Sequence, residues 1–66
     1  MKYWYLDMTN SHHFFVEFNG KREESSCVEA NSEDGWVVRE WEVGNAKRRR
    51  KFYGRVFIVR VSGLSR

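Results

Sequence analysis

Cys27 is the only cysteine in a chain of 66 residues, and this limits how the chain can hold a fold together. A chain this short buries only about 60% of its unfolded surface, so small domains often add disulfides, a metal or a partner subunit. One cysteine excludes an internal disulfide and every zinc site that is built from several cysteines. We therefore expect a single domain, residues 1–66, that depends on side-chain packing or on association with another chain.

Aromatic side chains supply much of the packing volume that cross-links do not. Phe, Trp and Tyr make up 17% of the residues, within a hydrophobic share of 41% and a charged share of 32%, which is typical of a globular chain. No apolar run approaches the roughly 20 residues of a membrane helix, and the N-terminal residues do not resemble a signal peptide. We expect a protein of the cytoplasm or nucleus that has no membrane partner.

Glycine and asparagine divide the chain into short segments that are rich in aromatic and β-branched residues, as strands are. The segments predicted to be strands are 3–8, 12–18, 36–43 and 52–62, and residues 44–51 between the last two are predicted to form a long hairpin loop. The expected fold class is mostly β. It is a small antiparallel sheet or an open barrel of four to five strands.

Asn19-Gly20 is the strongest local signal in the chain. This pair favours a two-residue type I′ turn, because both central residues of that turn need a positive φ. The turn would place Phe18 opposite Lys21 in an antiparallel hairpin. Since alternate residues of a strand share a face, the core face of this strand is predicted to carry Phe14, Val16 and Phe18.

The same register, continued away from the turn, would place His12 opposite Cys27. A thiol beside an imidazole can be a nucleophile, but the sequence offers no group to orient the imidazole and no oxyanion site, so we predict that the protein is not an enzyme. His12 and His13 would point to opposite faces of a strand and could not chelate one ion, and no cofactor is expected. Residues 26–33 stay open between a strand and one or two helical turns, because Ser26 and Glu29 have the spacing of a capping box.

Charge is strongly segregated along the chain. Residues 44–66 contain eight basic residues and no acidic residue, whereas residues 1–43 contain four basic residues and all nine acidic ones. Such segregation predicts a surface with one positive and one negative pole, and a polyanion is the natural partner of the positive pole.

A run of five consecutive cations at 47–51 lies within the basic part of the chain. Guanidinium groups bind phosphates with two hydrogen bonds, and aromatic side chains beside them can stack on unpaired bases. The residues predicted to bind nucleic acid are Lys47, Arg48, Arg49, Arg50, Lys51, Tyr53 and Arg55. The run also fits a solvated hairpin tip partly neutralised by Glu40 and Glu42, a contact for an acidic protein partner, or a nuclear localisation signal.

Exposed aromatic residues raise a second possibility, because a small sheet cannot bury eleven large rings completely. The residues predicted to form a protein interface are Tyr3, Tyr5, Trp36 and Trp41, with a homodimer as the simplest use of the interface. The leading hypothesis is a small, non-enzymatic DNA-binding or RNA-binding protein that contacts phosphates through a basic hairpin loop. The alternative is a protein-binding adaptor or inhibitor of the viral or mobile-element type.

Overall fold

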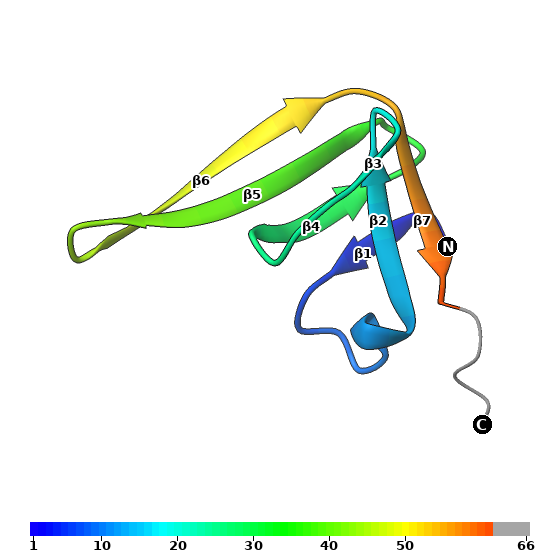
Figure 1. The fold of residues 1–66 in the computed structure, drawn as a ribbon, viewed down its shortest axis with the longest axis horizontal. Helices are drawn as coiled ribbons and strands as arrows, with labels where there is room; N and C mark the ends of the chain where they lie inside the picture. The colour runs from blue at the N-terminus through cyan, green and yellow to red at the C-terminus, as the bar shows by residue number, and fades with distance from the viewer. Residues whose placement is uncertain (62–66) are drawn as a thin grey trace.

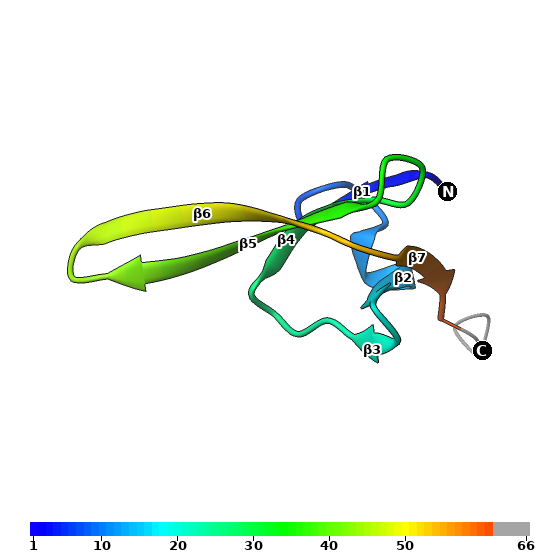
Figure 2. The ribbon, with the colours of Figure 1, turned by 90° about the horizontal axis from the view of Figure 1, so that it is seen from above.

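Two antiparallel sheets lie face to face in the structure, a computed structural model that describes residues 1–61 (Figures 1 and 2). The larger sheet has the strand order β1-β4-β5-β6 and the smaller sheet has the order β3-β2-β7. The strands are β1 (Tyr3–Tyr5), β2 (Phe14–Phe18), β3 (Lys21–Arg22), β4 (Cys27–Asn31), β5 (Trp36–Val43), β6 (Ala46–Tyr53) and β7 (Val56–Arg60), and a 3-10 turn, η1, covers Ser11–His13. The prediction of a small, mostly β, antiparallel fold is confirmed, and the two sheets do not close into a barrel.

The hairpin between β2 and β3 forms at the predicted Asn19-Gly20 turn. Asn19 has φ 52° and Gly20 has φ 88°, and Phe18 pairs with Lys21. The pairing stops at Arg22, however, because the chain then leaves this sheet and crosses to the other one.

The predicted pairing of His12 with Cys27 is therefore wrong. His12 lies in η1, and Cys27 pairs with Arg39 of β5. The physical reason is burial. Residues 21–26 are polar, whereas Cys27 can enter the core only by joining the larger sheet, where its exposed fraction is 2%.

β4 occupies the segment that the sequence left open between strand and helix. Its register shifts between Cys27 and Glu29, which is a β-bulge. Residues three apart in a regular strand point to opposite faces, but the bulge lets both Cys27 and Ala30 point into the core. Since the segment is a strand, the capping-box spacing of Ser26 and Glu29 does not start a helix.

The basic run lies on a strand, so the prediction of a long hairpin loop at 44–51 is wrong. Gly44 and Asn45 make a two-residue turn, and β5 pairs with β6 from Val43 opposite Ala46 to Trp36 opposite Tyr53. Gly44 has φ 62° while Asn45 has no positive φ, the pattern of a type II′ turn. The segment 52–62, predicted to pair with 36–43, does so only at Phe52 and Tyr53, which lie opposite Val37 and Trp36. It is divided between β6 and β7, and its last residue, Ser62, lies outside the described residues.

The division occurs at Gly54, where the chain passes from the larger to the smaller sheet. A Cβ atom on Gly54 would lie 2.6 Å from Oδ1 of Asn19 and 2.7 Å from Cε1 of Phe18, so any larger residue at this crossing would have to displace both side chains. Beyond it, β7 pairs with β2, with Ile58 opposite Val16. Since β6 runs directly into β7, the crossing ties the basic strand to the core.

The core lies between the two sheets. Its buried members are Trp4, Val16, Cys27, Ala30, Val37 and Val56, and Met8, Phe14, Phe18, Phe52 and Ile58 pack against them. The predicted inward face of β2 is thus confirmed. Among residues 1–61, no helix is long and apolar enough to cross a membrane.

Candidate nucleic-acid interface

The outer half of the β5–β6 hairpin projects from the body of the protein as a two-stranded ribbon (Figure 1). β4 accompanies β5 only as far as Arg39, and the last backbone bond between them runs from Glu40 N to Ser26 O at 2.9 Å. Residues 41–48 therefore have no third strand beside them among the described residues, and we call this ribbon together with its base, residues 39–51, the arm. The arm accounts for much of the elongation of the molecule, which measures 41 × 24 × 18 Å.

Strand alternation divides the five cations between the two faces of the hairpin. Val37 and Phe52, which are paired, point into the core and define the inner face. By alternation Arg48 and Arg50 share this inner face, whereas the outer face carries Lys47, Arg49 and Lys51. A loop would have left all five cations together, so the strand changes which of them can act on one ligand.

Two of the outer-face cations, Arg49 and Lys51, have side-chain partners within the protein. Arg49 Nε donates to Glu40 Oε2 at 2.8 Å, and this hydrogen bond lowers the pKa of Glu40 and raises that of Arg49. Lys47 lies opposite Glu42, and Lys51 Nζ is 4.3 Å from the ring centroid of Trp36. Lys47 forms no ion pair among the described residues, so of the two acidic residues predicted to neutralise the run Glu40 has a cationic partner and Glu42 does not.

The inner-face arginines differ in having no carboxylate partner within residues 1–61, although the Arg50 guanidinium lies 5.8 Å from the ring centroid of Phe52. Among the described residues, neither Arg48 nor Arg50 forms an ion pair with a carboxylate. Arg48 lies opposite Trp41, which is 43% exposed, and both arginines are exposed. The inner face of the arm thus combines two guanidinium groups with an accessible indole ring.

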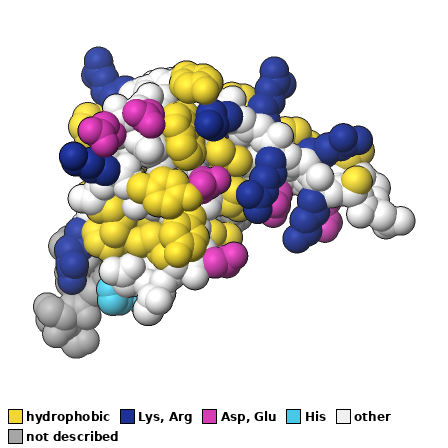
Figure 3. Space-filling view, turned by 180° about the vertical axis from the view of Figure 1, so that it is seen from behind, with side chains coloured by type: hydrophobic (Ala, Val, Ile, Leu, Met, Phe, Trp, Pro, Cys, Tyr) yellow, Lys and Arg dark blue, Asp and Glu magenta, His cyan; other side chains and the backbone are white. Residues whose placement is uncertain are grey.

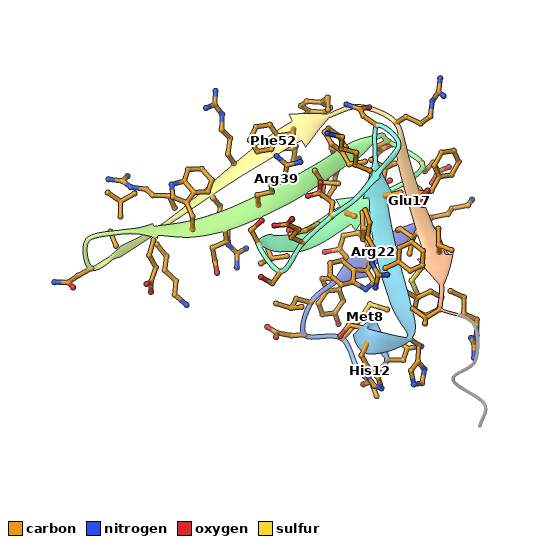
Figure 4. The ribbon with its side chains drawn as sticks, viewed as in Figure 1. Met8, His12, Glu17, Arg22, Arg39 and Phe52 are labelled. Atoms are coloured by element: carbon orange, nitrogen blue, oxygen red, sulfur yellow. The ribbon has the colours of Figure 1, made fainter. Side chains whose placement is uncertain are left out.

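The base of the arm is anchored by a third arginine of the inner face. Arg39 lies opposite Arg50, and its guanidinium is 4.8 Å from the ring centroid of Phe52 (Figure 4). Two like charges opposite each other would repel, but Glu23 holds Arg39 through two hydrogen bonds. Within residues 1–61, Arg50 is consequently the member of this pair that lacks a carboxylate partner. Nothing in the spacing of the sequence indicated Glu23 as the partner, because the contact joins two different sheets.

The remaining predicted nucleic-acid residues lie elsewhere. Tyr53 is 70% exposed on the outer face, opposite Trp36. Arg55 follows the Gly54 crossing, where its backbone N donates to Asn19 Oδ1 at 2.9 Å, and it lines a shallow hollow with Phe57. Neither residue joins Arg48 and Arg50 on the inner face.

Three of the four predicted interface residues come together on the outer face of the larger sheet. The ring centroid of Tyr3 is 5.7 Å from that of Tyr5 and 6.4 Å from that of Trp36. The Tyr3 hydroxyl donates to Glu29, which raises the pKa of Tyr3 to about 12. Figure 3 shows hydrophobic side chains over the body on this side and basic side chains along the arm. The fourth residue, Trp41, lies on the opposite face.

The described residues form no group of three or more His, Cys, Asp and Glu side chains that could hold a metal ion. The rings of His12 and His13 meet edge to face, with centroids 4.2 Å apart and an interplanar angle of 67°. Burial raises the pKa of the Cys27 thiol to about 11, so the thiol is protonated and a poor nucleophile at neutral pH.

No protein-family model matches the chain, and no curated protein or solved structure matches it either. Function is therefore inferred from the geometry of the two faces of the β5–β6 hairpin.

Proposed function

We propose that this protein binds nucleic acid through the inner face of the arm and does so without enzymatic activity. The observation that carries the proposal is the pair Arg48 and Arg50, which project from the hairpin without a carboxylate partner among the described residues. A guanidinium group can donate two parallel hydrogen bonds to one phosphate, and both groups are already exposed to an approaching ligand.

The other cations of the run have a supporting role in this proposal. Arg49 would have to leave Glu40 before it could bind a phosphate, and Lys51 would have to leave the face of Trp36. An exposed ion pair is weak and screened by water, so the outer cations still attract a polyanion at long range. Direct phosphate contacts are expected from the inner face.

The experiment compares two double variants that remove the same charge from opposite faces. Binding of fluorescent DNA and RNA oligonucleotides is measured by anisotropy as a function of salt for the wild type, Arg48→Gln with Arg50→Gln, and Lys47→Gln with Arg49→Gln. Each phosphate contact adds about 0.7–0.9 to the slope of log affinity against log salt, so loss of two contacts should flatten the slope by about 1.4–1.8.

The inner-face variant should show this change and the outer-face variant a smaller one. Equal losses in both variants would mean that the run acts only through its net charge, and the inner face would have no special role. A wild type that binds neither DNA nor RNA at low salt would end the proposal. The melting temperature of both variants should stay close to that of the wild type, because residues 47–50 are all exposed.

A second candidate function is supported by the outer face of the larger sheet. Tyr3, Tyr5 and Trp36 cluster there, and Tyr53 lies beside Trp36 across the strands, on a face that no described element covers. Exposed aromatic residues are enriched at protein interfaces. We propose this face as the contact for a second copy of the chain or for another protein, as in an adaptor or inhibitor. Both functions fit an intracellular location, in the cytoplasm or nucleus.

A further inference from the structure

We infer that the nucleic acid bound by the arm is single-stranded and that Trp41 stacks on one of its unpaired bases. This inference rests on the proposed nucleic-acid binding and names the class of ligand. It comes from the position of Trp41, which the strand pairing separates from the outer aromatic cluster and places among the inner-face arginines.

Trp41 is surrounded on the inner face by cations towards the body and by small side chains towards the tip. Arg48 lies directly opposite it, and the Cβ atoms of such cross-strand pairs are about 4.5–5.5 Å apart. Arg50 is the diagonal neighbour. Towards the tip the next cross-strand pair is Val43 and Ala46, whose short side chains leave the indole accessible.

The two inner-face arginines suit an extended strand of nucleic acid. Arg48 and Arg50 are two residues apart on β6, so their Cα atoms are separated by about 6.8 Å. Successive phosphates of an extended single strand have a comparable spacing, so one guanidinium can bind each of them. A base attached between them can then lie on the indole ring of Trp41.

A duplex fits this face less well. Its bases are stacked on one another and present only their edges in the grooves, so they offer no ring face to Trp41. Non-specific duplex binding also draws its affinity from many phosphate contacts, whereas this face offers two arginines without an ion-pair partner among the described residues.

The body of the protein closes one end of the same face. Glu23 and Ser26, in the connection from β3 to β4, line a hollow with Arg39 at the base of the arm. Figure 2 shows β3 well away from the plane of the β5–β6 hairpin, on the side of the smaller sheet. The inner face is therefore one wall of a corner, which a single strand can enter more readily than a rigid duplex.

The test uses three probes with matched phosphates: a 12-nucleotide oligo(dT), an abasic oligomer of the same length, and a 12-base-pair duplex. The proteins are the wild type, Trp41→Leu, Trp41→Phe, and Trp36→Leu as the control on the outer face. Base stacking on an aromatic ring contributes about 1–3 kcal/mol, so Trp41→Leu should weaken oligo(dT) binding about 5- to 150-fold. Abasic binding should not change, and Trp41→Phe should restore most of the loss.

The outcomes separate this inference from the proposed function. If the abasic oligomer binds as tightly as oligo(dT), Trp41 does not stack on a base, and if the duplex binds as tightly, the ligand is not specifically single-stranded. Either result overturns the inference and leaves phosphate binding by Arg48 and Arg50 in place. If the protein binds none of these probes and no RNA oligonucleotide, the proposed function itself fails. Should Trp41→Leu not fold, fluorescence of a Trp36→Phe variant replaces it. This variant keeps Trp41 and the buried Trp4, and oligo(dT) should quench the emission of the exposed Trp41 while the abasic oligomer should not. Equal quenching by the two oligomers would overturn the inference.

Discussion

Arg39 and Glu23 join the two sheets at the base of the arm through a pair of parallel hydrogen bonds. Nε donates to Oε1 at 2.8 Å and Nη2 donates to Oε2 at 2.7 Å. The Glu23 side chain is 9% exposed and that of Arg39 is 34% exposed, so the pair is only partly screened by water. The guanidinium also lies over the rings of Phe18 and Phe52, one from each sheet. This contact closes the core where β4 stops and the arm begins.

Glu23→Gln should therefore destabilise the protein. Hydrogen bonds to charged groups contribute about 1.5–3 kcal/mol each in favourable cases, and partial exposure of Arg39 reduces this, so we expect a loss of about 1–3 kcal/mol in the free energy of unfolding. Urea denaturation measures the loss. The control is Glu24→Gln, an exposed neighbour, which should change stability by less than about 0.5 kcal/mol. Equal effects of the two variants would show that the Arg39 contact does not stabilise the fold.

Gly20→Val should also lower stability, because Gly20 has φ 88° and a β-branched residue resists that conformation. No atom lies within 4 Å of a Cβ built on Gly20, so the cost comes from the backbone alone, about 1–3 kcal/mol. Each kcal/mol should lower the melting temperature by about 4–8 °C in a domain of this size. Asn45→Val is the control, since Asn45 is a hairpin turn residue without a positive φ. A Gly20→Val protein that melts at the wild-type temperature would contradict the turn geometry.

The buried thiol of Cys27 should make stability fall at alkaline pH. Its pKa is raised from the ordinary value of 9.0 to about 11, so between these values the folded chain retains a proton that the unfolded chain has lost. Stability is therefore full below about pH 9 and declines as the pH rises towards 11. At about pH 10.5 the thiol should account for about 1–2 kcal/mol of the decline.

Cys27→Ala isolates this effect. Both proteins are unfolded in urea at several pH values from 8 to about 10.5, and the stability difference between them should shrink as the pH rises, because the variant has no thiol to ionise. A difference that stays constant over this range would show that the thiol has the same pKa in the folded and unfolded chains.

The outer aromatic face predicts self-association. Pairing two such faces would bury rings that are 43% exposed at Tyr5 and 70% exposed at Tyr53 and would enlarge a small core. Sedimentation at micromolar concentration should show a species larger than the 8.0 kDa chain. Tyr5→Ser with Tyr53→Ser should shift it to the monomer, whereas Trp41→Ser, on the opposite face, should not. A wild-type monomer with a cooperative melt would exclude this use of the face.

Local features of the sequence were enough to predict part of this fold. The Asn19-Gly20 turn depends on the φ angles of two adjacent residues, and the inward face of β2 depends on simple alternation. Both were predicted correctly because neither requires knowledge of distant residues. The position of the basic run in the chain is equally evident from the sequence.

The arm was missed because five cations in a row are unusual in a strand. Gly44-Asn45 is a hairpin turn signal, and the register it implies places Glu40 and Glu42 opposite Arg49 and Lys47. These acidic residues offset the repulsion among the cations only once β5 and β6 have paired. The turn signal is therefore present in the sequence. Whether a strand could follow it depended on the pairing of β5 with β6, which brings the acidic residues opposite the cations.

The amino-acid sequence alone determines that the chain is mostly β, that it has no internal disulfide, and that its positive charge is concentrated near 47–51. The tertiary structure decides which charges are paired and which rings lie beside them. Strand order brings Tyr3 and Tyr5 near Trp36, while alternation sends Trp41 to the other face with Arg48 and Arg50. The physical reason is that partners across a sheet are set by pairing between distant segments, and the spacing of residues along the chain does not specify that pairing.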